Sequence, residues 1–271
     1  MDLQPNMNEN VDTGTLRIQL TNRSNGIPVQ GAKISVSYTG NPSQVIEEVS
    51  SDDSGNTETL TLNAPPLEYS MEPSEQQPYS EYTIQVTAPG YRDITVSAID
   101  ILPGEAAIQN VNMDQEDAPG NPIDTIVIPA HTLYGDYPPK IPEDEIKAMD
   151  ESGEIVLSRV VIPEYVVVHD GAPSDSTAND YYVRYRDYIK NVASSEIYAT
   201  WPAATIRANV LAIMSFTLNR VYTEWYRGKG YNFTITSSTA YDHKFMYGRN
   251  IFQSIATIVD EIFENYLSRP N

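Results

Sequence analysis

The spacing of hydrophobic residues changes once along this chain of 271 residues, and the change divides it into two kinds of structure. In the first part, apolar and polar residues alternate, which places every second side chain on the same face of a strand. Turn-forming pairs such as Asn25-Gly26 and Pro89-Gly90 separate the alternating runs. Short, evenly spaced strands predict a small β-sandwich over residues 14–113. The predicted strands are 15–20, 33–38, 57–62, 82–87 and 93–98.

From Tyr165 onward the pattern favours helices. Apolar residues at steps of three and four predict a helix over 203–227, which Gly228 and Gly230 end. Two further helices are expected at 186–197 and 250–268. The buried-looking run VVVHDG predicts a strand that ends at His169-Asp170, where we expect a structural histidine more than a ligand-facing pair. The fold class expected is therefore α+β and multidomain, with a mainly helical C-terminal domain.

Between these parts lies a segment rich in proline and acidic residues. Proline fixes φ and removes a backbone donor, so such runs suit an extended linker. Two short apolar patches in it, 126–129 and 155–157, are candidates for docking on a neighbouring domain. The predicted organisation is a disordered N-terminus at 1–13, a β-sandwich at 14–113, a linker at 114–163 and a helical domain at 164–271.

Composition excludes several classes of function. There is no cysteine, and the three histidines show no zinc-ligand spacing, so no metal or cofactor is expected. A formal charge of −20 disfavours nucleic acid and anionic membranes as partners. The start, MDLQPNMNEN, lacks the basic and apolar segments of a secretory signal, and no run reaches the ~20 apolar residues of a membrane span. We therefore expect a protein made in the cytoplasm without a signal peptide.

One acidic residue stands out. Glu196, in the run DYIKNVASSEIYATWP, lies among small and apolar neighbours directly before the long predicted helix. Desolvation disfavours the charged carboxylate and so raises its pKa, which is the property that a general acid needs near neutral pH. An isolated glutamate near a helix end is more often structural or solvated. Glu196 is nevertheless the candidate catalytic residue.

The same run resembles the sequence around the catalytic glutamate of the stage II sporulation protein D family, which cleaves peptidoglycan glycan strands. The shared elements are Tyr188-Ile189-Lys190, Val192-Ala193, Ser195-Glu196, Trp201-Pro202 and Arg207-Ala208-Asn209. The runs VVIPEYVVVHDG and TLNRVYTEWYRGKGY are similar to one branch, the spore cortex-lytic enzymes of clostridia (SleC type). IPVQGAKISV, SDDSGNTETLTL and YTIQVTAPGYRD resemble the transthyretin-like module found beside carboxypeptidase domains. In that family the module is a spacer or folding aid without chemistry.

The resemblance implies a spore cortex lytic transglycosylase that acts in germination on peptidoglycan glycan strands. In that reaction one carboxyl group, here Glu196, serves first as acid and then as base, and 1,6-anhydro-muramic ends result. The resemblance also implies a zymogen that a protease cuts within about 140–163, and deposition in the spore cortex or coat after synthesis in the mother cell.

Substrate-binding residues are expected in two places. The loop 237–249 stands where the family has a groove-lining loop, so Tyr241 is a candidate for stacking on a sugar ring. Asp242 and His243 are candidates for holding an N-acetyl or lactyl group, although Tyr241 also fits ordinary packing. Arg207 and Asn209 match polar residues of the family and suit helix surface equally well. Tyr198 completes the set of candidate substrate-binding residues.

Several departures from the family leave an alternative open. Met214 stands where the family has an arginine, the family's two cysteines are absent from the 237–249 loop, and a downstream SQWG-like motif is missing. These departures favour a non-catalytic amidase activator or spore-layer scaffold of the same fold, or a chain truncated at its C-terminus. The retained Glu196 favours the enzyme. A surface adhesin built on the β-sandwich is a third, weaker hypothesis, because it needs secretion.

Overall fold

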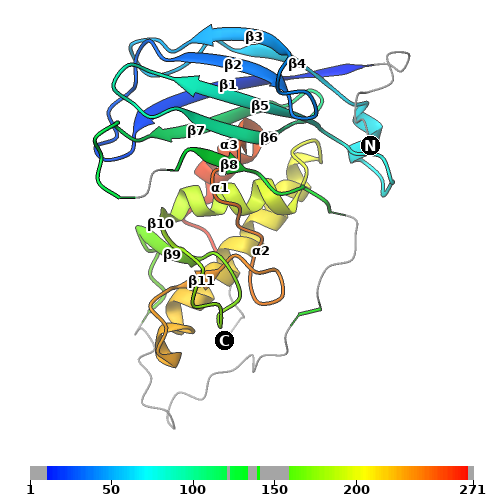
Figure 1. The fold of residues 1–271 in the computed structure, drawn as a ribbon. Coiled ribbons are helices and arrows are strands. Elements are labelled where there is room, and N and C mark those ends of the chain that lie inside the picture. The colour runs from blue at the N-terminus through cyan, green and yellow to red at the C-terminus, as the bar shows by residue number, and fades with distance from the viewer. Residues whose placement is uncertain (1–10, 121–122, 134–138, 141–158, 268–271) are drawn as a thin grey trace. The chain divides into compact units, whose positions relative to one another are not determined.

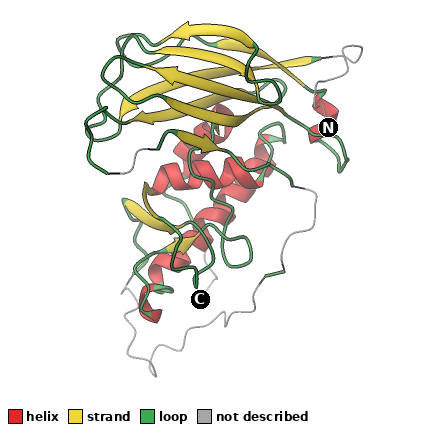
Figure 2. Ribbon diagram, viewed as in Figure 1, coloured by secondary structure: helices red, strands yellow, loops and turns green. Residues whose placement is uncertain are grey.

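The computed structural model describes residues 11–120, 123–133, 139–140 and 159–267, and it confirms the α+β class (Figures 1 and 2). The chain forms two compact units that interleave along the sequence. The first contains residues 1–132, 198–201 and 247–254, and the second contains 133–197, 202–246 and 255–271. The boundaries expected from the sequence divided the chain into consecutive segments instead. Residues 1–10 of the predicted disordered N-terminus (1–13) and most of the predicted cut region, 141–158, lie outside the described residues. Asp12 and Thr13 belong instead to the first strand.

The first unit consists of two sheets in a sandwich. One sheet has the strand order β12-β7-β1-β4 and the other β3-β2-β5-β6-β8. The strands are β1 (Asp12–Asn22), β2 (Lys33–Tyr38), β3 (Val45–Ser50), β4 (Leu60–Ala64), β5 (Ser80–Thr87), β6 (Ile94–Ile101), β7 (Ala106–Met113), β8 (Thr125–Val127) and β12 (Ile251–Phe252). A short 3-10 helix, η1, covers Leu67–Ser70.

Alternation explains the core of the sandwich. In β1 the side chains of Leu16, Ile18 and Leu20 are fully buried, and the residues between them are partly exposed. β1 pairs with β7 in parallel and with β4 in antiparallel orientation. The predicted strand 57–62 is wrong at its start, because β4 begins only at Leu60. Thr57 instead turns inward, and its Oγ1 accepts a 3.1 Å hydrogen bond from the Ile18 N–H.

The sandwich includes residues from far along the chain. β12 pairs with β7, and β8, which lies inside the predicted linker, pairs with β6. Arg249 is buried and donates from Nη2 to Oδ2 of Asp100 at 3.0 Å. Asn250 exchanges two hydrogen bonds with the backbone of Asp100, at 3.0 and 3.2 Å. These hydrogen bonds hold residues 249–252 in the sandwich. The buried charges of Arg249 and Asp100 are tolerated because they are paired with each other.

The second unit holds a three-stranded sheet and the helices. The sheet order is β10-β9-β11, from β9 (Tyr165–His169), β10 (Asp180–Arg184) and β11 (Ile235–Thr236). The helices are α1 (Tyr185–Glu196), α2 (Ala203–Tyr222) and α3 (Gln253–Ile262), of which residues 253–254 belong to the first unit, and the 3-10 helix η2 covers Arg227–Lys229. Among the described residues, no helix is long and apolar enough to cross a bilayer.

The predicted helices hold with three corrections at their ends. The helix expected at 186–197 is α1 within one residue at each end. The helix expected to reach Arg227 ends at Tyr222, because Glu224 takes a left-handed backbone with φ of 49°. The helix expected at 250–268 begins at Gln253, since Ile251 and Phe252 pair with β7 as a strand, and it ends already at Ile262. The predicted strand at His169 is β9, and the His169 ring stacks on Phe233 at 4.4 Å while its Nδ1 contacts Asp180 at 2.8 Å.

Candidate functional site

Glu196 is the last residue of α1 and is partly exposed as a residue, while protein atoms largely surround its carboxyl group. The backbone N–H of Lys244 donates to its Oε1 at 2.8 Å. Burial raises the pKa of Glu196, and the Lys244 N–H and the charges of Lys140 and Lys244 offset part of that rise. Glu196 therefore holds its proton to higher pH than an exposed glutamate, as a general acid requires.

Asn191 fixes the loop that supplies the Lys244 N–H. Its Nδ2 donates to the carbonyl of Met246 at 2.8 Å, and its Oδ1 accepts from the Met246 N–H at 3.0 Å. The side chain is buried, and it lies on α1 like Glu196. A side-chain amide that pairs with both the N–H and the C=O of one residue holds the chain at a fixed distance and orientation. Asn191 thus places the residues just before Met246 against the end of α1.

Tyr188 and His243 form a buried pair beside Glu196. The Tyr188 hydroxyl is 3.3 Å from Nδ1 of His243, and both Asp242 and Glu196 contribute to raising the pKa of Tyr188, after burial itself. Burial lowers the pKa of His243 to about 4, so its ring is neutral near pH 7. The ring of Phe216 packs against His243 at 4.7 Å. Glu196 therefore has neutral, hydrogen-bonding neighbours on this side rather than a permanent positive charge.

Asp242 is engaged within the protein. Its Oδ1 accepts from Arg220 Nε at 2.8 Å. Its Oδ2 accepts from the Tyr226 hydroxyl at 2.6 Å and from the N–H and hydroxyl of Thr236 at 2.9 and 2.7 Å. Its carbonyl accepts from Lys140 Nζ at 2.7 Å. Four donors on one buried carboxylate explain how the charge is tolerated, and they join the 237–249 loop to α2 and β11.

The structure brings only some of the predicted site residues together. Glu196 and His243 lie around Tyr188, and Asp242 and Tyr241 precede His243 in the same loop, with Tyr241 partly exposed. Arg207 forms an ion pair with Glu261, and Asn209 donates to the Thr205 carbonyl at 2.9 Å on the surface of α2. Tyr198 belongs to the first unit, where its hydroxyl donates to the His131 carbonyl at 3.2 Å. Binding of sugar by these side chains stays a prediction.

Sequence reasoning missed four contributors to the site, namely Tyr188, Asn191, Lys140 and Lys244. Tyr188 and Asn191 share the buried side of α1 with Val192 and Ser195, and a polar residue at such a position was a usable signal. Lys244 acts through its backbone N–H, which no side-chain pattern reveals. Lys140 lies in the predicted linker, far from the glutamate in sequence.

Glu196 lines neither of two cavities of the structure, and the described residues hold no candidate metal site. One cavity lies at the end of α2, and the second, of about 140 Å³, lies near Arg23 and Arg92 in the first unit. Among the described residues, no group of three histidine, aspartate or glutamate side chains could hold a metal ion.

Comparisons with known proteins give little on function. No protein-family model matches the sequence, and no curated protein matches it either. Among solved structures, the chain is similar to a minor pilin of Streptococcus agalactiae, with 12% identity and a TM-score of 0.29 over 41% of this chain and 48% of the pilin. It thus spans about half of the pilin's length.

Two other solved structures show a similar degree of likeness. The wild-type catechol 1,2-dioxygenase of Acinetobacter radioresistens shares 15% identity with a TM-score of 0.28, over 43% of this chain and 58% of that enzyme. The 5-hydroxyisourate hydrolase of Klebsiella pneumoniae shares 15% identity with a TM-score of 0.25, over 37% of this chain and 90% of that enzyme. Scores this low carry no argument about the activity of the chain.

Proposed function

We propose that this protein is a peptidoglycan lytic transglycosylase of the spore cortex-lytic type, with Glu196 as its single acid and base. The observation that carries the proposal is that Glu196 is a partly exposed residue and that burial raises the pKa of its carboxyl group. The resemblance of the run around it to the sporulation protein D family supplies the substrate class. The second unit, with α1, α2 and residues 237–246 of the loop, is then the lytic domain.

The chemistry uses one carboxyl group twice. Protonated Glu196 gives its proton to the glycosidic oxygen between muramic acid and glucosamine, and the bond from that oxygen to C1 breaks. The carboxylate then takes the proton of the muramic acid C6 hydroxyl, whose oxygen bonds to C1 and closes the 1,6-anhydro ring. Glu196 ends protonated, as it began. No water enters, so the second carboxylate of ordinary glycoside hydrolysis is not needed.

The neighbours of Glu196 suit this cycle. The Lys244 N–H stabilises the carboxylate that exists after the first proton transfer, because a hydrogen bond to the charged form favours it. Neutral His243 and Tyr188 add polar groups without the strong pKa depression that a histidinium would cause. The carboxyl group can therefore lose and regain its proton within one reaction.

Product analysis tests the proposal. Purified cortex glycan is incubated with the protein, with Glu196→Gln, and with Glu264→Gln, an exposed glutamate of the same unit that serves as the matched control. Mass spectrometry then measures 1,6-anhydro-muramic ends. We expect these ends from the wild type and the control and none from Glu196→Gln. Absence of anhydro ends from folded wild-type protein that binds glycan would refute the proposal.

One observation favours a second candidate, a non-catalytic amidase activator or spore-layer scaffold. Glu196 lines neither of the two cavities described above, and Met214 is fully buried where the family carries an arginine. A scaffold would bind glycan equally well with Glu196→Gln and release no product in either form. The same experiment therefore separates the two candidates. The activating cut within about 140–163 falls mainly on residues outside those described.

A further inference from the structure

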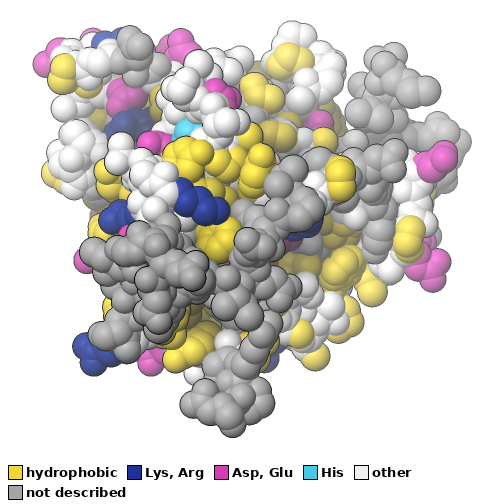
Figure 3. All heavy atoms as spheres, turned by 90° about the horizontal axis from the view of Figure 1, so that it is seen from below, with side chains coloured by type: hydrophobic (Ala, Val, Ile, Leu, Met, Phe, Trp, Pro, Cys, Tyr) yellow, Lys and Arg dark blue, Asp and Glu magenta, His cyan; other side chains and the backbone are white. Residues whose placement is uncertain are grey.

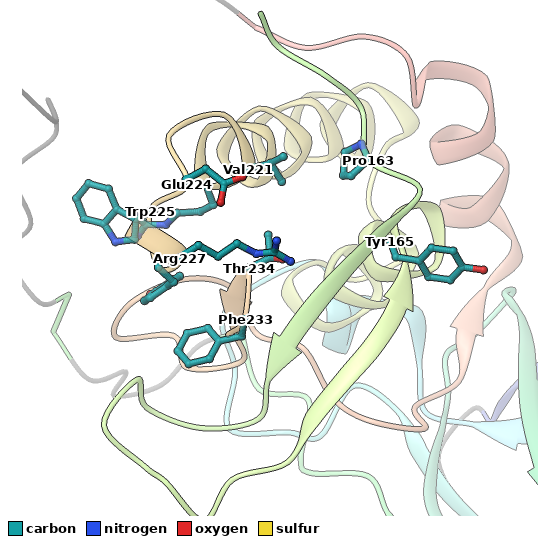
Figure 4. Close-up of a pocket in the computed structure, with 10 residues that line it drawn as sticks. Pro163, Tyr165, Val221, Glu224, Trp225, Arg227, Phe233 and Thr234 are labelled. Atoms are coloured by element: carbon teal, nitrogen blue, oxygen red, sulfur yellow. The ribbon is translucent and has the colours of Figure 1, made fainter. Parts of the chain in front are cut away.

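A cavity of about 160 Å³ lies in the second unit where α2 ends (Figure 4). Its walls come from the end of α2 and the turn after it, from Pro163 and Tyr165 at the start of β9, and from Phe233 and Thr234 before β11. Trp225, Tyr226 and Phe233 form a buried aromatic cluster with Val167 beneath it. Pockets that hold a whole drug-sized ligand measure roughly 300–1,000 Å³, so this cavity fits one group of a larger ligand.

The turn that follows α2 and borders the cavity has a glutamate, Glu224, at the position where such turns usually have glycine. After α2 the Trp225 N–H donates to the Arg220 carbonyl and the Glu224 N–H donates to the Val221 carbonyl, each at 3.2 Å. These two bonds define a Schellman motif, in which the residue at the position of Glu224 is left-handed and is usually glycine. Glu224 has φ of 49°. A glutamate kept in a strained position at the edge of a cavity indicates a use for its carboxylate.

Two charged side chains at this cavity have no partner within the described part of the chain. Glu224 and Arg227 both line it, and neither side chain makes a hydrogen bond or an ion pair with any described residue. The third charged lining residue, Arg220, is engaged by Asp242. The cavity thus offers one carboxylate and one guanidinium above an aromatic floor. In Figure 4, Glu224 and Phe233 lie on opposite sides of the cavity.

The geometry points to a binding site for a zwitterionic α-amino-acid group, such as the free end of a diamino acid in a peptidoglycan stem peptide. The ammonium group would bind Glu224, the carboxylate would bind Arg227, and the attached methylene chain would lie along the cavity wall that Trp225 and Phe233 help to form. The identity of the ligand as a stem peptide rests on the proposed function. The site would let the protein recognise peptide-bearing strands as well as glycan.

Other ligand classes fit the cavity less well. A simple anion would leave the Glu224 carboxylate facing a like charge, and a simple amine would face Arg227. A neutral sugar ring would leave both charges without a counterion. A ligand cation would also find the Trp225 ring already occupied. Lys229 Nζ lies 3.8 Å and the Arg220 guanidinium 4.6 Å from the centre of that ring. Figure 3 shows hydrophobic side chains beside Lys and Arg side chains on one face of the molecule.

Binding can be measured without any cleavage assay. The protein has two tryptophans, so its indole N–H region in an NMR spectrum holds two signals, and the Trp201→Phe variant assigns the Trp225 signal. Free meso-diaminopimelic acid is titrated, with pimelic acid and cadaverine as probes that carry only the carboxylates or only the amines. We expect meso-diaminopimelic acid alone to shift the Trp225 signal. Glu224→Gln and Arg227→Gln should each weaken its binding by about tenfold, as loss of one charge-assisted hydrogen bond does.

The controls separate this inference from the proposed function. Glu264→Gln should bind like the wild type, and Glu196→Gln should bind normally even when it releases no glycan product. No shift of the Trp225 signal at saturating diaminopimelic acid would overturn the inference. So would equal shifts from pimelic acid or cadaverine, a shift produced by N-acetylglucosamine instead, or unchanged binding in both Glu224→Gln and Arg227→Gln.

Discussion

The backbone N–H of Lys244 lies 2.8 Å from Oε1 of Glu196 and donates to it, although 48 residues separate the two in sequence. The carboxyl group of Glu196 therefore depends on a loop whose position is set elsewhere. The first prediction therefore concerns Asn191, the residue that fixes the position of this loop.

Replacement of Asn191 by alanine should raise the pKa of Glu196 further. The variant loses both hydrogen bonds to Met246, so the Lys244 N–H no longer stays beside the carboxylate that it stabilises. The pKa is measured from the carboxyl carbon signal in a ¹³C NMR titration. Asn209→Ala, at a partly exposed position on α2, is the control and should leave the pKa of Glu196 unchanged. An unshifted pKa of Glu196 in folded Asn191→Ala would show that the two Asn191–Met246 hydrogen bonds are not needed to hold the loop in place.

Glu196→Gln should stabilise the fold near neutral pH while it removes activity. The folded-state pKa of Glu196 is raised, so the folded protein binds this proton more tightly than the unfolded chain does. As pH rises through the unfolded-state value of about 4.5 and then the folded-state value, the carboxylate becomes charged in a poorly solvated place and stability is lost. The gain in the free energy of unfolding, measured with urea, should be present near pH 7 and vanish in acid. A gain that does not depend on pH would have another cause.

His243 should make the fold less stable in mild acid. Its folded-state pKa is about 4, and an unfolded histidine titrates near 6.5. Above the unfolded value both states are neutral, and below it only the unfolded chain gains the proton. Stability should therefore fall as pH drops from about 6.5 to about 4, by about 3 kcal/mol in total. Urea unfolding of His243→Gln should lack this part of the slope. Equal slopes for wild type and variant would contradict the prediction.

Glu224→Gly should raise the free energy of unfolding by about 1 kcal/mol, because glycine adopts a positive φ without the steric cost that glutamate meets there. Glu224→Gln is the matched control, since it removes the charge and keeps the strained backbone. Equal stabilisation by both substitutions would trace the effect to charge instead of backbone strain. The comparison needs only thermal or urea unfolding curves.

Arg249→Met should destabilise the first unit by about 3–5 kcal/mol, since it leaves the Asp100 carboxylate buried without its main partner. The double variant with Asp100→Asn should recover part of that loss, because no buried charge then remains. Urea unfolding of the single and double variants gives both numbers. A double variant no more stable than Arg249→Met would show that the ion pair is not what the substitution disturbs.

The sequence predicts the regular parts of this fold well and the connections between them poorly. β2 coincides with the predicted strand 33–38, and α1 lies within one residue of the predicted helix at each end, because strict periodicity reports local structure. β7 was missed since Gln109 and Asn110 interrupt its apolar pattern. Gln109 is fully buried in the strand because its Nε2 donates to the Gly248 carbonyl at 2.8 Å, a contact across 139 residues.

In the candidate site, too, the sequence predicts some features and not others. The position of Glu196 at the end of a helix and its raised pKa follow from its small and apolar neighbours. The partners of its carboxyl group do not, because a backbone N–H carries no signature in the sequence. Asp242 was predicted from its place in a loop, and only three-dimensional packing reveals that Arg220, Tyr226 and Thr236 already use its oxygens.

The interleaving of the first unit bears on what a proteolytic cut can achieve. Asp100 and β7 lie before residues 133–163, whereas Arg249 and β12 lie after them, and all four belong to the same sandwich. A chain nicked between them would still share a continuous sheet and a buried ion pair across the break. The two fragments should therefore migrate together under native conditions and part only in denaturant. A cut would thus break the chain between the two fragments, while the fragments themselves stay associated through the sandwich.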